Sequence, residues 1–307
     1  MSRAVIHESF GAPEVLEVRE VLGPHAGPGQ VRVRVAAAGL NPMDWLLASS
    51  AELAHGFGYT VPSGFGHDLA GMVDQVGDGV DGFAPGDRVY GGALGGAVAD
   101  YALVRPAVGG LFHTPDGISN VVAATLPVAG PSADAALNAI GLQAGDTVLI
   151  GGAAGGVGVF AVQLARLAGA TPIGTCSEGT FEFMRKLGAE PVAYGPGLAE
   201  RVRLLAPGGV TAATDLFGTE TVEAALALGV SPDRISAIAA GPNPPGGVHA
   251  TGGSDAPPDA LDRITEAITA GRLTVPIAAT FPIGEIREAV TLQRHRHVHG
   301  KVVITLS

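Results

Sequence analysis

The 307-residue chain is poor in cysteine, in basic residues and in long apolar runs. Its single cysteine, Cys176, can build neither a disulfide framework nor a cysteine-only zinc cluster within one chain. The 18 basic and 29 acidic side chains give a net charge of -11, which argues against a surface that binds nucleic acid. No apolar run reaches the roughly 18 residues of a membrane-spanning helix, and the sequence MSRAVIHESFG lacks the apolar core of a signal peptide. We therefore expect a cytoplasmic protein with neither a membrane nor a nucleic-acid partner.

Apolar side chains are plentiful. Hydrophobic residues make up 47% of the chain and charged residues 15%, which predicts a folded protein with packed cores. The length is sufficient for two domains, each with a core of its own.

The first hundred residues have the pattern of β-strands. Gln30–Ala36 alternates valines with arginines, which is typical of an antiparallel strand with one face buried. The other strands expected here are Ala4–His7, Leu16–Val21, Leu69–Val76, Arg88–Tyr90 and Ala97–Val104.

From about Ser119 helices and strands alternate, which predicts a parallel sheet covered on both faces. Ser119 is expected to cap a helix through Thr125, and Ser132 a helix over Ala133–Ile140. The expected strands are Thr171–Thr175, Val192–Tyr194, Ala212–Leu216 and Arg234–Ala239. The expected helices are Phe181–Leu187, Leu198–Leu205, Thr221–Leu228 and Asp259–Ala270. A strand, a helix and a strand follow at Ile277–Phe281, Glu285–Gln293 and Val302–Leu306.

A glycine-rich turn lies in the stretch Thr147–Arg166. Five glycines between positions 151 and 158 separate an apolar strand from a helix rich in Ala and Leu. This order forms a site for a dinucleotide pyrophosphate at the helix N-terminus. Ala153-x-Gly155-x-x-Gly158 fits the fingerprint spacing, with Ala in the place of the first glycine and Gly156 and Val157 inside the turn. A tight strand-to-helix loop needs some glycines in any case, but strand, turn and helix together favour the dinucleotide.

Several motifs along the chain resemble one known family. They are Gly39-Leu40-Asn41-Pro42-Met43-Asp44-Trp45, Gly66-His67-Asp68-Leu69-Ala70-Gly71, Val76-Gly77-Asp78-Gly79-Val80, Gly86-Asp87-Arg88-Val89-Tyr90-Gly91, Leu126-Pro127-Val128-Ala129-Gly130, Ala153–Gly158 and Gly300-Lys301-Val302-Val303. In this order they resemble the medium-chain dehydrogenase/reductase superfamily, in its zinc-free quinone-oxidoreductase branch.

The resemblance implies an α/β fold of two domains. A GroES-like β-rich catalytic domain would comprise residues 1–121 and 275–307, and a Rossmann domain with a doubly wound parallel sheet would comprise residues 122–274. It also implies a homodimer that joins Rossmann sheets edge to edge. By resemblance alone, Ala129, Gly130, Gly241 and Thr251 are placed near the nicotinamide.

Zinc-dependent relatives hold the metal with a Cys, a His and a third ligand that is often Cys. Here His67 stands at the His position, but Asn41 replaces the first Cys and Val128 occupies the region of the third ligand. One His and one amide cannot build a tetrahedral zinc site, so we expect an enzyme without a metal. The cluster Arg294–His299 is interpreted as a solvated loop or a contact to an anion rather than as a metal site.

Ser177 stands where NAD-binding Rossmann domains carry an acidic residue on the ribose. A serine is compatible with a 2′-phosphate, so we favour NADPH, with Ser177 and Thr180 near that phosphate. No basic residue follows, and Glu178 could instead hold the ribose of NADH.

Without a metal or a protein nucleophile, we expect hydride transfer from the nicotinamide to a quinone or to the C=C bond of an α,β-unsaturated carbonyl compound. Asn41 is the candidate donor to the oxygen on which charge develops, although it could only shape a turn before Pro42. Asp44 is expected to hold this loop, and Tyr59 to act as proton donor or as an aromatic lid. The alternative function is that of a non-catalytic dinucleotide-binding protein with a structural or regulatory role.

Overall fold

The computed structural model describes residues 2–108 and 110–306, and the chain divides into two compact units. Unit 1 comprises Met1–Val128 and Ile277–Ser307, and unit 2 comprises Ala129–Pro276. The first boundary falls inside helix α4 (Leu126–Ala139), because the start of this helix packs with unit 1. There the backbone N–H of Val128 donates to a carboxylate oxygen of Asp68, 3.4 Å away.

Unit 1 is built on two sheets. The larger has the strand order β15-β16-β3-β5-β6-β8, and β7 pairs with β3 as well. Its strands are β3 (Val31–Leu40), β5 (Asp68–Val76), β6 (Arg88–Gly92), β7 (Tyr101–Val104), β8 (Leu111–His113), β15 (Ile277–Pro282) and β16 (Lys301–Thr305). The smaller sheet joins β1 (Ser2–His7) to β2 (Glu17–Val21) and β4 (Ser63–Gly64).

The central strand β3 explains why this sheet forms. Val31, Val33 and Val35 are fully buried while the two arginines between them stay accessible, as the alternation predicts. The core around them takes residues from both ends of the chain, including Val302 and Ile304 of β16. The strand expected over Ala97–Val104 is shorter than predicted, because only Tyr101–Val104 enters the ladder with β3.

Two short helices follow β3 that the strand pattern of this region does not predict. Helix α1 (Pro42–Ser49) begins after the N-cap Asn41, and its first residue is a proline, which needs no hydrogen-bonded N–H at that position. Helix α2 (Ala51–Gly56) is capped by the Ser50 side chain, which accepts from the N–H of Leu53. Unit 1 also contains α3 (Asn120–Ala123), capped by Ser119 as predicted, and α10 (Ile286–Arg294). The beginning of α1 is thus determined by its local sequence, Asn41 followed by Pro42.

Unit 2 contains one parallel sheet of six strands in the order β11-β10-β9-β12-β13-β14. The strands are β9 (Thr147–Gly151), β10 (Thr171–Cys176), β11 (Glu190–Ala193), β12 (Ala212–Asp215), β13 (Ile235–Ala237) and β14 (His249–Ala250). The chain order reverses on the two sides of β9, so the sheet is doubly wound with a switch point beside β9.

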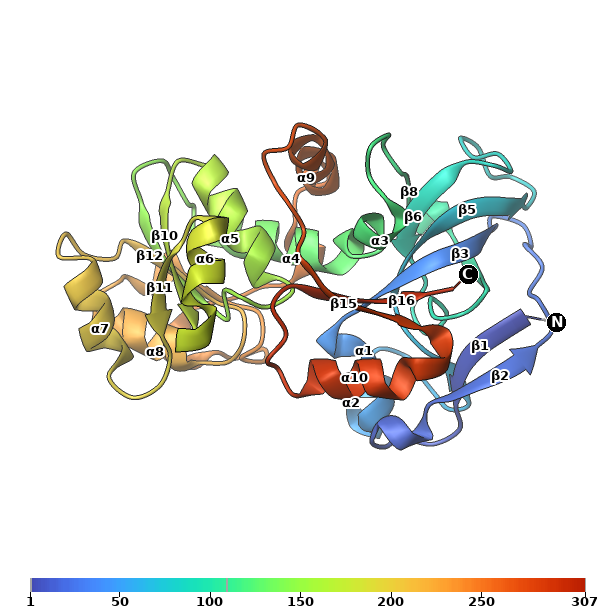
Figure 1. Ribbon diagram of the computed structural model, residues 1–307, viewed down its shortest axis with the longest axis horizontal. Coiled ribbons are helices and arrows are strands. Elements are labelled where there is room, and N and C mark those ends of the chain that lie inside the picture. The colour runs from blue at the N-terminus through green and yellow to red at the C-terminus, as the bar shows by residue number, and fades with distance from the viewer. Residues whose placement is uncertain (1, 109, 307) are drawn as a thin grey trace. The chain divides into compact units, whose positions relative to one another are not determined.

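Helices flank this sheet (Figure 1). They are α5 (Gly158–Leu167), α6 (Phe181–Leu187), α7 (Leu198–Leu205) and α8 (Glu220–Ala227). The unit also contains α9 (Ala260–Thr269), whose Ile264 lies beside Gly130 of α4. On one face, Leu198 and Val202 of α7 and Val222 of α8 pack on Leu149 and Ile173 of the strands. This packing confirms a Rossmann-type core covered by crossover helices.

The helix α4 corrects one prediction. We expected Ser132 to cap a helix over Ala133–Ile140, but α4 begins at Leu126 and passes through Pro131 and Ser132. Because alanines on both sides of this point are buried, among them Ala129 and Ala133, packing outweighs the local stop signal of Pro131.

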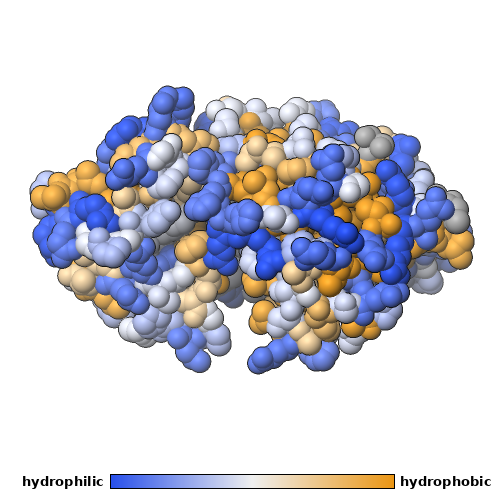
Figure 2. Space-filling view, turned by 60° about the horizontal axis from the view of Figure 1, so that its bottom comes forward, coloured by the Kyte–Doolittle hydropathy of each residue, from blue (hydrophilic) through white to orange (hydrophobic). Residues whose placement is uncertain are grey.

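No helix in the described part of the chain is both long and apolar enough to cross a membrane. Figure 2 shows hydrophilic and hydrophobic residues interspersed over the visible face.

Candidate functional site

The glycine turn after β9 has the geometry of a dinucleotide fingerprint. Helix α5 begins at Gly158, and a Cβ placed on Gly158 would lie 2.3 Å from the carbonyl oxygen of Gly152 and 2.4 Å from that of Ala153. Only glycine allows the helix to start this close to the turn. At Gly155 a Cβ would meet one atom, the carbonyl oxygen of Gly152 at 3.3 Å, which is a tight contact but far milder than those at Gly158, so the backbone here is less enclosed by the protein and can be approached by a ligand.

The alanine in the first fingerprint position is accommodated by the neighbouring strand. A Cβ on Gly174 of β10 would lie 2.8 Å from the Cβ of Ala153, so the glycine leaves room for the Ala153 methyl group. Thr175 holds the same turn through two hydrogen bonds. Its Oγ1 accepts from the backbone N–H of Gly152 at 3.0 Å, and its carbonyl oxygen accepts from the backbone N–H of Ala153 at 3.2 Å. Gly174 thus makes room for Ala153 at the fingerprint position where a glycine is usual, and Thr175 fixes the turn.

The end of β10 brings Ser177 and Thr180 together. Their hydroxyl oxygens lie 2.6 Å apart, and Thr180 is buried while Glu178 between them is exposed. Two small hydroxyls and one solvent-facing carboxylate therefore stand next to the glycine turn. The preference between NADPH and NADH stays a prediction on these residues.

The remaining predicted cofactor residues lie on several elements of unit 2. Gly241 follows β13 with a φ of 76°, and Thr251 follows β14, where its hydroxyl donates to Asp255 at 3.1 Å. Ala129 is fully buried in α4. Apart from Ala129 and Gly130, which both lie in α4, every predicted cofactor residue thus follows the carboxyl end of a strand, the edge at which open parallel sheets bind ligands.

Asp215, the last residue of β12, was missed by the sequence analysis. Its carboxylate accepts backbone N–H groups of Phe217, Gly218 and Thr221 at 2.8 to 2.9 Å, and the residue is 2% exposed. The sequence signal that could have identified Asp215 is a carboxylate at the end of a strand, followed within three residues by a glycine. Asp215 holds the loop on the other side of β9.

Unit 1 contains a buried polar cluster around Asn41. The Asn41 Nδ2 donates to Asp68 Oδ2 at 2.8 Å, and the Asn41 Oδ1 accepts from Lys301 Nζ at 2.6 Å. Asn41 is 2% exposed, Asp68 is fully buried and Lys301 is 2% exposed. The motifs contain Asp68 and Lys301, but their spacing in the chain assigns them no role, because 260 residues separate Asn41 from Lys301.

Asp44 holds the loop, as its position suggests. Its Oδ2 accepts from the backbone N–H of Asn41 at 2.7 Å, while its Oδ1 is buried without a partner among the described residues. Burial raises the pKa of Asp44 to about 7; the hydrogen bond from Asn41 opposes this rise, and the charge of Asp68 adds to it. Asp44 therefore exchanges a proton near neutral pH.

His67 and Lys301 complete the charges of this cluster. His67 Nδ1 lies 3.0 Å from Asp68 Oδ1. Burial lowers the pKa of His67, but the hydrogen bond and the charge of Asp68 outweigh it, so that this pKa is raised. Burial lowers the pKa of Lys301, against the opposing effect of the Asp68 and Asp44 charges. The cluster balances two carboxylates with two basic groups.

Tyr59 lies in the same unit. Its hydroxyl donates to the carbonyl oxygen of Gly64 at 2.5 Å, and its ring stacks on that of His7 with centroids 6.2 Å apart. Burial raises the pKa of Tyr59, so the phenol keeps its proton at neutral pH. Both predicted roles, proton donor and aromatic lid, stay open.

The donor set around Asn41 does not fit zinc. The amide oxygen already accepts from an ammonium group, His67 faces a carboxylate, and Val128 has no donor side chain. Among the described residues no group of three His, Cys, Asp or Glu side chains could hold a metal ion. In the cluster 294–299, Arg294 and Arg296 lie over the Trp45 ring, with guanidinium carbons 5.5 and 5.8 Å from its centroid.

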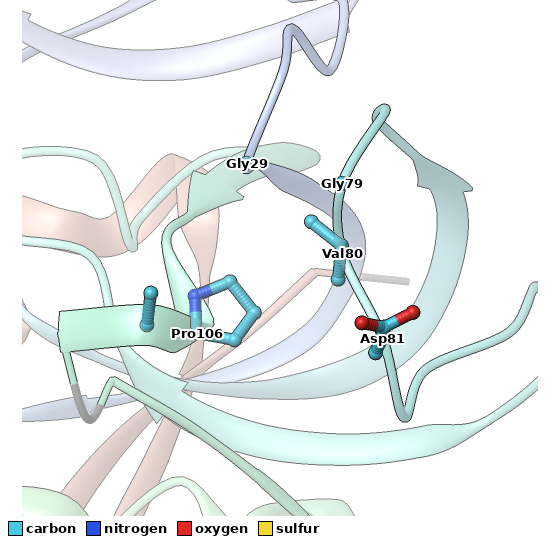
Figure 3. A pocket seen from close by; sticks show the side chains of 6 residues that line it. Gly29, Gly79, Val80, Asp81 and Pro106 are labelled. Carbon is cyan, nitrogen blue, oxygen red and sulfur yellow. The ribbon is translucent and has the colours of Figure 1, made fainter.

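A surface hollow of about 290 Å³ lies elsewhere in unit 1 (Figure 3). It is lined by Gly29, Gly79, Val80, Asp81, Pro106 and Ala107. Asp81 contributes the one charged side chain, and no set of polar groups converges on the hollow, so we assign it no function.

Two family profiles match the chain. "Alcohol dehydrogenase GroES-like domain" matches residues 27–116, and "Zinc-binding dehydrogenase" matches residues 187–304. Among curated relatives, the NAD(P)H oxidoreductase RTN4IP1, mitochondrial, of Danio rerio is 30% identical over 327 residues, which cover 91% of this chain and 84% of that protein. A quinone oxidoreductase of Pseudomonas aeruginosa is 38% identical over 179 residues, 56% of this chain and 53% of that protein.

Several of the strongest curated matches are partial. The match spans 53% of the Pseudomonas aeruginosa protein and 9% of the spectinabilin polyketide synthase system protein NorB of Streptomyces orinoci, which is 39% identical over 66% of this chain.

Solved structures match along the whole chain. The quinone oxidoreductase from Coxiella burnetii has a TM-score of 0.87 at 29% identity and covers 100% of this chain and 99% of that one. The CurK enoyl reductase has a TM-score of 0.87 at 26% identity, covering 100% and 99%. A mycobacterial protein solved in complex with NADPH has a TM-score of 0.86 at 25% identity, covering all of both chains.

A doubly wound sheet with a dinucleotide fingerprint and a β-rich unit made from both chain ends define the class of nicotinamide-dependent dehydrogenases and reductases. Together with the relatives, they show that the chain belongs to the medium-chain dehydrogenase/reductase superfamily, in its quinone oxidoreductase branch. The resemblance drawn from the motifs is confirmed.

Proposed function

We propose that the protein is a zinc-independent, NADPH-dependent oxidoreductase that transfers hydride to a quinone or to the C=C bond of an α,β-unsaturated carbonyl compound. The observation that carries the proposal is the fingerprint turn at the edge of a parallel sheet: Gly158 admits no Cβ, and at Gly155 one carbonyl oxygen, that of Gly152, is the sole atom within 4 Å of a Cβ placed there. The names of the relatives, quinone oxidoreductases and an enoyl reductase, support this substrate class.

The cofactor would be held by residues of unit 2. The N–H groups of Ala153 to Gly158 suit a pyrophosphate, Ser177 and Thr180 suit a 2′-phosphate, and Ala129, Gly241 and Thr251 are proposed near the nicotinamide. When bound, the cofactor supplies the hydride. The protein orients the two reactants and keeps water away from them.

On the side of the acceptor, Asn41 is the proposed donor to the oxygen that becomes negative. One of its two amide hydrogens is used by Asp68, and the other can serve the acceptor. Asp44 keeps the backbone of Asn41 in place through the hydrogen bond that its carboxylate accepts from the Asn41 N–H. Tyr59 or solvent then supplies the proton.

The poor fit of zinc to the donor set around Asn41 supports a proposal on which bond is reduced. A simple ketone needs strong polarisation before it accepts hydride, and a neutral amide provides less than a metal would. A quinone or enone delocalises the incoming charge onto a distant oxygen as a phenolate or an enolate. We therefore expect saturated ketones and alcohols to be poor substrates.

The test is to incubate the protein with an enone and, in separate reactions, with each of the two 4-deuterated epimers of NADPH. One epimer should place deuterium on the β-carbon and the other should give unlabelled product. Deuterium on the carbinol carbon, or rapid oxidation of simple alcohols, would contradict the proposed substrate class. Binding of NADPH without its consumption across a panel of quinones and enones would favour the non-catalytic alternative.

We further propose a homodimer formed through the sheet edges of unit 2, and a cytoplasmic location. In the described sheet the edge strands are β11 and β14, and each offers an unpaired ladder of backbone groups. The single cysteine is buried and free, as suits a reducing compartment. Sedimentation and cell fractionation test the two statements.

A further inference from the structure

Lys301 is unusual in this chain because it is a buried lysine. Of the 18 basic side chains only two are lysines, Lys186 and Lys301, and all others are arginines. The side chain of Lys186 is 73% exposed and pairs with Glu182 on the surface, whereas Lys301 is 2% exposed. A compact ammonium group has therefore been placed where burial opposes its charge.

The contacts of Lys301 show what this charge does. Its Nζ donates to Asn41 Oδ1 at 2.6 Å and to the carbonyl oxygen of Leu40 at 3.2 Å. The negative charges of Asp68 and Asp44 favour the ammonium form, against burial. The lysine is thus tied to the Asn41 carboxamide and to the backbone of the preceding residue.

Two charged partners orient the amide without ambiguity. An ammonium group only donates hydrogen bonds, and an ionised carboxylate only accepts them. The amide oxygen of Asn41 must therefore face Lys301, and its nitrogen must face Asp68. A cation on the amide oxygen also draws electron density from the nitrogen, which makes the remaining N–H a stronger donor.

We propose that Lys301 is a positioning residue that holds the Asn41 carboxamide in this orientation and leaves its second, polarised N–H for the acceptor oxygen. The inference rests on the proposed function, in which Asn41 donates to the acceptor. Lys301 itself touches no reacting atom, so its effect passes through Asn41.

A double-mutant cycle tests this route. Lys301→Met keeps the length of the side chain and removes its charge, and the exposed Lys186→Met is the matched control. We expect Lys301→Met to lower kcat about tenfold to a hundredfold, below the loss of a full oxyanion donor, with the KM for NADPH unchanged within about twofold. Adding Lys301→Met to Asn41→Ala should lower kcat no further, because the residues act as one unit. An unchanged kcat in Lys301→Met, or the same loss in both backgrounds, would overturn the inference.

A second variant separates positioning from simple destabilisation. Lys301→Met alone removes one of the two basic groups that balance the buried carboxylates Asp68 and Asp44, and the variant can fail to fold. Combining it with Asp68→Asn removes both charges, and the new amide can still accept from Asn41. We expect this double variant to melt closer to the wild type and to keep the low kcat. Recovery of wild-type kcat would show that Lys301 only neutralised Asp68.

A measurement without turnover keeps the inference separate from the proposed function. The chain has four asparagines, so selective labelling with ¹⁵N-asparagine gives a simple spectrum, in which Asn41→Ala identifies the Asn41 side-chain resonance. This resonance should shift in Lys301→Met and stay in place in Lys186→Met. If the wild type reduces no quinone or enone, the proposed function fails, and an unmoved resonance would independently overturn the role of Lys301.

Discussion

Replacing Gly158 by alanine is expected to lower the stability of the protein, whereas replacing Gly155 by alanine is expected to weaken cofactor binding. At Gly158 the added methyl group would meet backbone carbonyls at 2.3 and 2.4 Å, which cannot give way as a flexible side chain would. At Gly155 the nearest protein atom is a carbonyl oxygen at 3.3 Å, and φ lies outside the left-handed region. The first change strains the protein itself, and the second mainly fills space meant for the ligand.

Overpacking of this kind lowers the free energy of unfolding by about 1–3 kcal/mol. For a unit of this size, Gly158→Ala should therefore lower the melting temperature by roughly 3–10 °C. Gly155→Ala should change the melting temperature by no more than about 2 °C, because only one carbonyl oxygen, that of Gly152, has to give way, and only slightly. Its methyl group should instead weaken NADPH binding about tenfold, which corresponds to roughly 1.4 kcal/mol.

The assay is thermal unfolding without cofactor together with a fluorescence titration of NADPH for both variants. A Gly158→Ala protein that melts like the wild type would show that the turn relaxes freely, against the geometry. A Gly155→Ala protein that binds NADPH with wild-type affinity would show that the pyrophosphate does not lie at this turn.

Three further predictions address the metal, the cofactor and the buried acid. Dialysis against a chelator should leave turnover unchanged, whereas stoichiometric zinc that is required for activity would contradict the donor set around Asn41. Glu178→Gln should raise the ratio of catalytic efficiencies, NADPH over NADH, by up to about fivefold, the range of one exposed charge; a fall in this ratio would exclude repulsion by Glu178. Burial raises the pKa of Asp44 from 3.8 to about 7, so between these values the native state binds more protons than the unfolded chain and the free energy of unfolding falls as pH rises. This loss, roughly 4 kcal/mol in total, should be absent in Asp44→Asn. Denaturant titrations at several pH values from 4 to 8 measure it, and a free energy of unfolding that changes equally with pH in both proteins would refute it.

Unit 2 follows closely from the sequence because its signals are local. Helices Phe181–Leu187 and Leu198–Leu205 have the predicted bounds, since an apolar stripe of helical period and a following turn mark each of them. The glycine turn was found for the same reason, because strand, turn and helix are consecutive. Ser132 was misjudged since burial of the alanines around it outweighs its tendency to cap a helix.

Unit 1 was less predictable because its decisive contacts join distant parts of the chain. Helices α1 and α2 are short, and Asn41 was recognised from its motif without the partners that hold it. Asp68 and Lys301 reach Asn41 from 27 and 260 residues away, and no periodicity encodes such separations. Residue patterns indicate which side chains carry chemistry, while only the folded sheet shows what orients them.

The position of β16 has a consequence for the order in which the protein can form. Strand β16 lies between β15 and β3 inside the larger sheet of unit 1, whereas unit 2 is one continuous segment of chain. During synthesis unit 2 can fold as soon as it has emerged, but β3 waits for a neighbour that is made after the whole of unit 2. Until then Asp68 and Asn41 lack the cation that Lys301 brings. A chain that stalls before β16 would therefore contain all of unit 2 while the polar cluster around Asn41 still lacked Lys301, so under the proposed function cofactor binding and turnover would be acquired at different moments of synthesis.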